Sequence, residues 1–419
     1  MDIEIKRDYY LGQLIQRQNN GLIKVITGIR RCGKSFLLRT LFKKYLTANG
    51  VDEDHIIEMA FDLFDNIDYR DPKVFYPWAL ERLRDEGKYY FLLDEVQMLG
   101  EFVSVLNGLA DKKNCDVYVT GSNANFLSKD IVTEFGGRSD EIHMYPLSFS
   151  EFMTFYEGSP FEGWNEYITY GGIPLVALAE LEEQKMTLLD NLLKETYIRD
   201  IVKRNKIRNI GEMEALLDVL ASAIGALTNP NKLQKTFKRV RQSKITATTI
   251  TKYIEYLEDA FMIEEAKRYD IKGKSYIGTP VKYYFMDLGL RNARINYRQM
   301  EVTHSMENVI YNEMRMRGFS VDVGNLNIVE KGKEGKHVKK QLEIDFICNK
   351  GSKKYYIQSA YLLETEEKTA QEIRPFLKIH DSFKKIVITS NTPKPFYNED
   401  GILFMNVFDF LLKPELLEF

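Results

Sequence analysis

The chain has 419 residues, of which 44% are hydrophobic and 28% are charged, and its formal net charge is −3. This is an ordinary globular composition, and the length suits two or three domains. The three cysteines, Cys32, Cys115 and Cys348, lie far apart, which excludes a disulfide framework or a zinc site and fits reduced thiols. Because we find no membrane-spanning run and no secretion signal, we expect a cytoplasmic protein with no membrane partner.

A glycine-rich motif near the amino terminus carries the strongest chemical signal. Residues 28–35 have the G-x-x-x-x-G-K-S spacing of a phosphate-binding loop, between a predicted strand over 22–27 and a predicted helix over 36–42. Backbone amides of the loop and the helix amino terminus attract phosphate, Lys34 can reach the β- and γ-phosphates, and Ser35 can ligate Mg²⁺. The predicted nucleotide contacts are Gly28, Arg30, Arg31, Cys32, Gly33, Lys34, Ser35 and Phe36.

A second apolar run, over residues 89–93, ends in two acids. The run shows no alternation of polar and apolar residues, which is typical of a parallel strand buried on both faces. An open α/β sheet places its chemistry at the carboxyl ends of such strands. We therefore expect Asp94 to hold Mg²⁺ and Glu95 to polarise the attacking water, with an acidic helix cap as the alternative interpretation.

Two further positions are candidates for the same site. A predicted strand over 116–120 leads to Ser122 and Asn123. In ATPases with an extra strand between the loop strand and the acidic strand, a polar residue at this place senses the γ-phosphate; a simple turn is the alternative. Arg138 follows two glycines and is a candidate catalytic arginine, acting in its own chain or on a neighbouring subunit, unless it caps a helix or pairs with Asp140.

These motifs occur in an order that resembles a known family. In chain order they are Thr27–Ser35, Leu93–Gln97, Thr120–Asn123, Gly137–Arg138 and Tyr145–Phe149. The order is similar to that of the prokaryotic AAA-type ATPase family with a C-terminal nuclease-like domain of unknown function, and the resemblance runs from about Ile5 to the C-terminus. It implies a three-layer P-loop NTPase fold with a parallel sheet. It also implies ATP with Mg²⁺ as the ligand. The residues alone contain no base-reading motif that would separate ATP from GTP, so the assignment of ATP comes from the resemblance.

The middle of the chain predicts a helical connector followed by a winged helix. A long helical region over 181–206 leads to residues 232–244, which contain six basic and no acidic side chains. A helix from Thr246 and two strands joined by a basic turn at 272–274 come next. Helices followed by such a hairpin are typical of a winged helix-turn-helix, so we expect DNA or RNA to bind in the region 232–282.

Charge segregation supports a polyanionic partner for this segment. From residue 225 to residue 298 the chain has fifteen Lys or Arg and seven Asp or Glu, a local charge of +8, so the rest carries about −11. The acidic remainder of the same chain is an alternative partner. Glu255, Glu258 and Asp259 on the predicted recognition helix also argue against phosphate contact there.

The last third resembles the restriction-endonuclease-like fold but lacks part of its chemistry. Carried over by position, Glu307 matches the helix acid and Asp345 the first strand acid, whereas Gln358 replaces the second strand acid and Ala360 the lysine. A neutral amide binds Mg²⁺ more weakly than a carboxylate, and alanine cannot activate water or stabilise phosphate charge. We expect a degenerate nuclease-like site that serves binding or assembly.

The sequence predicts four regions: an AAA-type P-loop ATPase domain over 1–160, a helical lid or connector over 161–225, a winged-helix-like domain over 226–300 and a degenerate nuclease-like α/β domain over 301–419. Near the degenerate site, Glu343 and Glu364 are candidate replacement acids. The expected function is slow Mg²⁺-dependent ATP hydrolysis that moves a nucleic-acid-binding module. A nucleotide-gated scaffold for protein partners is the alternative, and an ATP-dependent nuclease ranks last. An oligomer would be needed for Arg138 to act between subunits.

Overall fold

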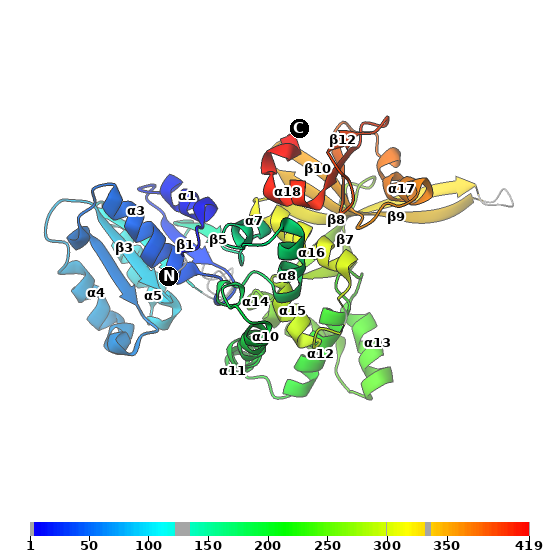
Figure 1. Cartoon of the computed structure of the whole chain (residues 1–419). Helices are drawn as coiled ribbons and strands as arrows, with labels where there is room; N and C mark the ends of the chain where they lie inside the picture. The colour runs from blue at the N-terminus through cyan, green and yellow to red at the C-terminus, as the bar shows by residue number, and fades with distance from the viewer. Residues whose placement is uncertain (1–3, 122–134, 299, 332–336, 419) are drawn as a thin grey trace. The chain divides into compact units, whose positions relative to one another are not determined.

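The computed structural model describes residues 4–121, 135–298, 300–331 and 337–418, which form two compact units (Figure 1). The first unit comprises Met1–Pro146 with Asp259–Phe261, and the second comprises Leu147–Glu258 with Met262–Phe419. The three cysteines are buried free thiols. Within the described ranges, every helix is too short or too polar to cross a bilayer.

The first unit is built around a five-stranded sheet in which every pairing is parallel. In the spatial order β2-β3-β4-β1-β5, its strands are β1 Ile23–Thr27, β2 Ile56–Ala60, β3 Tyr89–Asp94, β4 Cys115–Thr120 and β5 Ser139–His143. All residues of β1, β3 and β4 are buried, as expected for a sheet covered on both faces. The predicted parallel sheet is confirmed, with β4 inserted between the loop strand and the acidic strand.

Helices lie on both faces of this sheet. Side chains of α4 and α5 pack against one face, whereas Phe42, in the helix after the loop, packs against Tyr118 on the other face with ring centroids 4.6 Å apart. The helix after the loop is continuous, with a π-helical stretch in its middle. The elements are α1 Asp8–Gln16, α2 Lys34–Phe36, η1 Leu37–Phe42, α3 Lys43–Ala48, η2 Glu53–His55, η3 Phe64–Arg70, α4 Pro72–Leu80, η4 Val96–Met98 and α5 Phe102–Ala110.

The second unit begins with a run of helices. Ser148 and Ser159 start the first two helices through capping boxes with Glu151 and Glu162. Each serine hydroxyl accepts a hydrogen bond from the glutamate backbone N–H, and each glutamate carboxylate accepts one from the serine backbone N–H. The helices are α7 Phe149–Met153, α8 Pro160–Tyr170, α9 Pro174–Ala177, α10 Glu182–Asn191, η6 Leu192–Ile198, α11 Arg199–Asn205, α12 Ile210–Ser222, α13 Pro230–Arg241, α14 Ala247–Asp259 and α15 Leu288–Arg294.

An eight-stranded mixed sheet forms the rest of the second unit. Its spatial order is β12-β13-β11-β10-β9-β8-β6-β7. The strands are β6 Ile263–Asp270, β7 Ser275–Phe285, β8 Ser320–Lys331, β9 His337–Lys350, β10 Lys353–Ser359, β11 Lys384–Thr389, β12 Phe396–Tyr397 and β13 Leu403–Asn406. Strand β6 pairs with β8 in parallel, so the hairpin predicted as a wing belongs to the same sheet as the nuclease-like region. The predicted boundary at residue 300 therefore does not separate two compact units.

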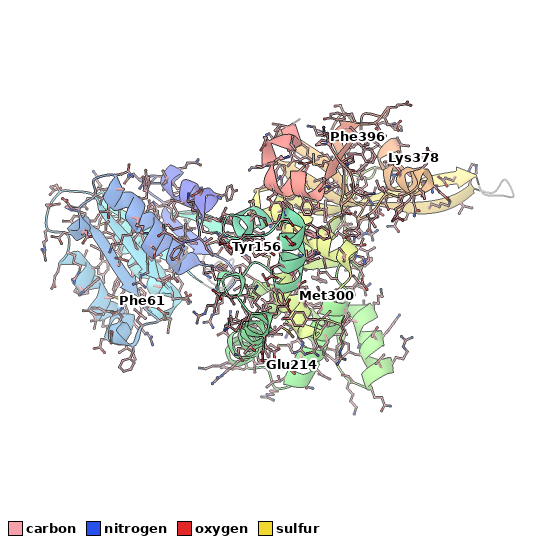
Figure 2. All side chains as sticks on the ribbon, viewed as in Figure 1. Phe61, Tyr156, Glu214, Met300, Lys378 and Phe396 are labelled. Carbon is pink, nitrogen blue, oxygen red and sulfur yellow. The ribbon has the colours of Figure 1, made fainter. Side chains whose placement is uncertain are left out.

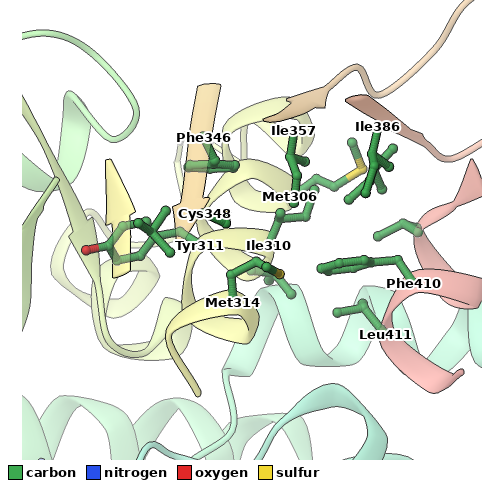
Figure 3. Packing of buried hydrophobic residues seen from close by; sticks show 14 of the residues in the cluster. Met306, Ile310, Tyr311, Met314, Phe346, Cys348, Ile357, Ile386, Phe410 and Leu411 are labelled. Carbon is green, nitrogen blue, oxygen red and sulfur yellow. The ribbon is translucent and has the colours of Figure 1, made fainter. Parts of the chain in front are cut away.

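Helices also cover both faces of the eight-stranded sheet. They are α16 Val302–Met316, α17 Glu366–Ile373, η7 Phe376–Lys378, α18 Val407–Leu412 and η8 Pro414–Glu418. Side chains of α16 and α18 bury one face, and those of α17 and η7 bury the other. Figure 3 shows the first of these cores, where residues of α16 meet side chains of β9, β10, β11 and α18, among them Met306, Tyr311, Phe346, Ile357, Ile386 and Phe410.

Candidate nucleotide-binding site

The glycine-rich loop joins β1 to α2 at the carboxyl edge of the first sheet. Gly28 and Gly33 have φ angles of 136° and 101°, in the region that favours glycine, and Arg31 has a φ of 65°. A Cβ atom on Gly28 would lie 2.0 Å from the carbonyl oxygen of Met144, so only glycine fits at that position. The backbone thus turns tightly enough to enter a helix at Lys34.

Lys34 is held inside its own loop. Its Nζ donates hydrogen bonds to the carbonyl oxygens of Gly28, at 2.8 Å, and Ile29, at 3.0 Å, and the residue is only 4% exposed. Both partners are neutral. Because hydrogen bonds between an ammonium and an ionised phosphate are stronger than those to a carbonyl, phosphate oxygens can displace these partners.

Asp94 and Ser35 meet next to the loop. The Ser35 hydroxyl donates to Asp94 Oδ1 at 3.0 Å, the Thr120 hydroxyl at the end of β4 donates to the same oxygen, and Asp94 is buried. The backbone N–H of Phe61, labelled in Figure 2, donates to the carbonyl oxygen of Asp94 at 3.1 Å. The Ser35 hydroxyl and the Asp94 carboxylate are hard oxygen donors, which Mg²⁺ prefers. Water and phosphate oxygens would supply the remaining ligands, so this donor set fits the ion.

Glu95 follows directly and leaves the strand direction. Its φ of 50° is in the left-handed region, which is strained for a residue other than glycine. The Glu95 N–H donates to the Thr120 hydroxyl at 3.0 Å, and the Gln97 side-chain amide donates to the Glu95 carboxylate. Thr120 therefore contacts both acids. The sequence pattern predicts Thr120 only as the end of a strand, although a hydroxyl that closes an apolar run is a signal for such a role.

A second residue that the sequence did not reveal is Arg7, which supports the loop from before α1. Its guanidinium donates to the carbonyl oxygens of Cys32, at 2.9 Å, and Tyr145, at 2.7 Å, and it lies 4.8 Å from the ring centroid of Tyr10. The Tyr10 hydroxyl accepts a hydrogen bond from the Tyr145 N–H at 3.0 Å. Arg7 is 2% exposed, and no motif surrounds it in the sequence.

The remaining predicted nucleotide contacts are distributed unevenly. Cys32 is buried with its Sγ 3.5 Å from the carbonyl oxygen of Met144, so it fills the space behind the loop. Arg31 and Phe36 are exposed, and Arg30 is half-buried. Ser122 and Asn123 lie outside the described residues. The γ-phosphate-sensing role predicted for them stays a prediction.

Arg138 lies at the amino ends of the strands, at the opposite end of β1 from the loop. Its carbonyl oxygen accepts a hydrogen bond from the N–H of Ile23, at the start of β1, and at a rise of about 3.3 Å per residue the loop begins roughly 15 Å away. Its exposed guanidinium pairs with Asp111 at 2.9 Å, whereas Asp140 pairs with Arg17. This position does not allow Arg138 to reach the phosphate site of its own chain. The catalytic role predicted for Arg138 in a neighbouring subunit stays a prediction.

In the second unit, the structure brings the degenerate nuclease-like residues together. Gln358 Oε1 accepts a hydrogen bond from the Asp345 N–H at 3.4 Å, and its amide donates to Glu372 at 3.0 Å. Glu307 and Asp345 both approach Lys282, a residue outside the predicted set. The side-chain amide of Gln358 is thus bonded to a glutamate of α17.

Comparison with known proteins assigns the first unit. The family model described as an AAA domain matches residues 20–153, and a domain of unknown function, DUF8612, matches residues 161–301. An uncharacterized protein of Haemophilus influenzae is 36% identical over 420 residues, which cover 98% of this chain and 99% of that protein. The chain belongs to the family of this protein. Its AAA domain has the parallel α/β fold of P-loop NTPases, which generally bind ATP with Mg²⁺.

More distant relatives and solved structures are also similar to the AAA family member described here. The uncharacterized protein MJ1544 of Methanocaldococcus jannaschii is 28% identical over 417 residues, 94% of this chain and 86% of that protein. The Aeropyrum pernix Orc1 protein in complex with DNA is 13% identical, with a TM-score of 0.29, covering 71% of this chain and 94% of that one. Cdc6p from Pyrobaculum aerophilum is 13% identical, with a TM-score of 0.33, covering 74% and 97%. At such TM-scores the two structures add nothing to the assignment.

Proposed function

We propose that the chain binds and slowly hydrolyses ATP in its AAA domain and that the nucleotide state moves a nucleic-acid-binding module in the second unit. One observation carries the first half of this proposal. Lys34, Ser35, Asp94 and Glu95 lie at one edge of a parallel sheet, with Ser35 in contact with Asp94 and Thr120 contacting both acids.

Each side chain has a definite task in this proposal. Lys34 would exchange the carbonyl oxygens of Gly28 and Ile29 for phosphate oxygens. Ser35 and Asp94 would hold Mg²⁺, which when bound neutralises charge on the β- and γ-phosphates. Glu95 would orient the attacking water and accept its proton.

The second half of the proposal concerns the helices and hairpin of the second unit. Helices α12, α13 and α14 precede the β6–β7 hairpin, and Thr228, between α12 and α13, forms an antiparallel bridge with Val281 of β7. This order, with a single β-bridge beside the hairpin, is typical of a winged helix. It supports the nucleic-acid-binding module but does not identify the nucleic acid.

The positive charge of this module gathers on α13. A groove of about 430 Å³ lies along this helix, lined by Asn229, Asn231, Lys232, Lys235, Thr236, Arg239 and Thr279. Among these lining residues three are cationic and exposed, and none is acidic. The neighbouring helix α14 exposes one basic and one acidic side chain, Lys252 and Glu255. Phosphate contact is therefore proposed for α13 and not for the helix expected from the sequence to read bases.

The test of the AAA site is the rate of ATP hydrolysis, with and without DNA or RNA. Glu95→Gln should slow hydrolysis by about 100-fold or more while ATP still binds, because only the proton acceptor is lost. Equal hydrolysis by the variant would contradict the role of Glu95. Absence of ATP binding by the unmodified chain with Mg²⁺ would remove the whole proposal.

The test of α13 is the salt dependence of nucleic-acid affinity. Replacing Lys232, Lys235 and Arg239 by alanine should reduce the slope of log affinity against log salt by about 3, roughly one for each lost phosphate contact. The matched control replaces Lys368, Lys378 and Lys394, three exposed lysines of the second unit, and removes the same charge. Equal losses in both triple variants would show a non-specific charge effect. A rate of ATP hydrolysis that does not change when nucleic acid is added would favour the nucleotide-gated scaffold for protein partners.

A further inference from the structure

A buried lysine lies among the acids of the nuclease-like region. Lys282 Nζ is 2.8 Å from Glu307 Oε1, 2.8 Å from Glu343 Oε1 and 3.8 Å from Asp345 Oδ1. The lysine is 3% exposed, Glu307 and Asp345 are buried, and Glu343 is half-buried. A single ammonium thus faces three carboxyl groups that come from α16 and β9.

The lysine reaches this place from a distant strand. Two strands, β8 and β6, lie between β9 and β7 in the hydrogen-bonded order, so the sheet must curl to bring Lys282 to β9. Lys282 pairs with Ala266, next to the irregularity in register between Ala266 and Arg268. Such irregularities bend a strand and redirect its side chains. The hairpin predicted as a wing therefore supplies a cation to the acids of the nuclease-like region.

We infer that Lys282 is a built-in cation that occupies the place of a divalent metal, so that the nuclease-like site binds no metal and cleaves no nucleic acid. A divalent ion would need the same carboxylate oxygens that the ammonium contacts at 2.8 Å. Over the described ranges, no three His, Cys, Asp or Glu side chains are arranged to hold a metal. The residues present therefore do not fit the ion that the fold would imply.

Further contacts engage both oxygens of Glu307 and the second oxygen of Asp345. The Tyr284 hydroxyl donates to Glu307 Oε1 at 2.5 Å, and His304 Nδ1 lies 3.5 Å from Glu307 Oε2. The backbone N–H of Ser359 donates to Asp345 Oδ2 at 2.8 Å. A buried charge cluster with this many internal partners is stable without an added ion, and removal of its cation leaves buried acids uncompensated.

The electrostatics of the cluster agree with this geometry. Burial and the Glu307 carboxylate raise the pKa of Asp345 to about 8. Burial opposes ionisation of Glu307 as well, but Lys282 and the other hydrogen-bond donors hold its pKa below the ordinary value.

The test uses the full chain with Lys34→Ala, so that the nucleotide site and its metal do not contribute. Mn²⁺ is the probe, and electron paramagnetic resonance measures the free ion. The Lys34→Ala parent should bind no Mn²⁺ in the second unit. Adding Lys282→Met should create one site with a dissociation constant of about 10⁻⁴ M, and Asp345→Asn should remove it again. Lys267→Met, which removes an exposed lysine of β6, should create none.

Three results of the Mn²⁺ experiment would overturn the inference. The first is Mn²⁺ binding by the parent that Asp345→Asn abolishes. The second is a folded Lys282→Met variant that gains no site. If the Lys282→Met variant unfolds, added Mn²⁺ should restore its folded signal. The third contradicting result is that Mn²⁺ fails to restore it. Because all arms carry Lys34→Ala, the outcome is independent of ATP binding. Plasmid cleavage by the unmodified chain with Mn²⁺, if lost in Asp345→Asn, would also contradict the inference.

Discussion

Two buried lysines, one in each unit, have opposite surroundings. Lys34 in the phosphate-binding loop contacts two neutral carbonyl oxygens, whereas Lys282 in the nuclease-like region contacts carboxylates. Their exposures are nearly equal, at 4% and 3%. Burial alone therefore does not distinguish a binding lysine from a structural one. What distinguishes them is whether the partners compensate the charge.

The comparison indicates how a cation can be kept available for a ligand. A lysine with neutral partners retains its charge for an incoming anion, and exchanging carbonyls for phosphate strengthens its hydrogen bonds. A lysine between acids has already lost that capacity, because its charge is neutralised inside the protein. The same residue type thus indicates a ligand site in one unit and the absence of a metal site in the other.

Replacing Lys282 should give the largest loss of folding stability. A small loss would contradict the contrast drawn between the two lysines. Lys282→Met should lower the free energy of unfolding of the second unit by about 3–5 kcal/mol, because it leaves buried acids without their cation. Its ATP affinity should stay unchanged. Trp164 is buried in the second unit and can report urea unfolding once Trp78, in the first unit, is replaced by phenylalanine. A loss below 1 kcal/mol would mean that the cluster is not compensated by this lysine.

Replacing Lys34 should give the converse result. Lys34→Ala should weaken Mg-ATP binding by about 100-fold, or about 3 kcal/mol, since a charged contact to phosphate is lost. The free energy of unfolding should change by less than about 1 kcal/mol, because only neutral carbonyls lose a partner. Titration with a fluorescent ATP analogue measures the first effect. Lys43→Ala, further along the same helix, is the control and should bind normally.

Asp287 extends the comparison from buried lysines to buried acids, because it is a buried carboxyl group whose hydrogen-bond donors are neutral. The N–H groups of Gly172, at 2.7 Å, and Leu290, at 3.1 Å, donate to it, yet burial raises its pKa to about 6. The unfolded chain ionises this group near pH 4 and the folded chain only near pH 6, so folding stability falls as pH rises between these values. Asp287→Asn should abolish the contribution of this group, which lowers the free energy of unfolding by about 3 kcal/mol over this pH range.

The measurement for Asp287 is the difference in unfolding free energy between the unmodified chain and Asp287→Asn at pH values from 4 to 7. Subtraction cancels the other titrating groups. A difference that does not vary with pH would show that Asp287 ionises alike in both states. A difference that varies in the opposite direction would contradict the assigned sign.

Glu343 should give the smallest effect of the four. It contacts Lys282 at 2.8 Å, but its side chain is 36% exposed, so water screens the pair. Glu343→Gln should therefore cost about 1 kcal/mol or less, measured with the same Trp164 signal. A loss as large as that of Lys282→Met would show that Glu343, and not Glu307, is the principal partner.

The parts of the site that the sequence predicted depend on short contiguous patterns. The loop spacing placed Lys34 and Ser35, and the apolar run ending in Asp94 predicted both a buried parallel strand and an acid near the loop. The glycines before Arg138 indicate a turn, but they do not indicate at which end of the strands Arg138 lies. That position is set by the pairing of β5 with β1, which has no local signal in the sequence.

The parts that escaped prediction depend on contacts between distant residues. Lys282 meets β9 only because a hairpin joins a sheet whose other strands come later in the chain. A lysine inside the apolar run of residues 281–286 was a signal for a buried partner, but the partner could not be identified from spacing. Thr120 has a hydroxyl in the right place only because β4 lies between β1 and β3.

Arg7 has a practical consequence for anyone who divides this chain into fragments. The AAA family match begins at residue 20, yet the guanidinium that binds the backbone behind the loop comes from thirteen positions earlier. A fragment trimmed to the match would leave the carbonyl oxygens of Cys32 and Tyr145 without this donor. Weak nucleotide affinity in such a fragment would then report the trimming and not the protein.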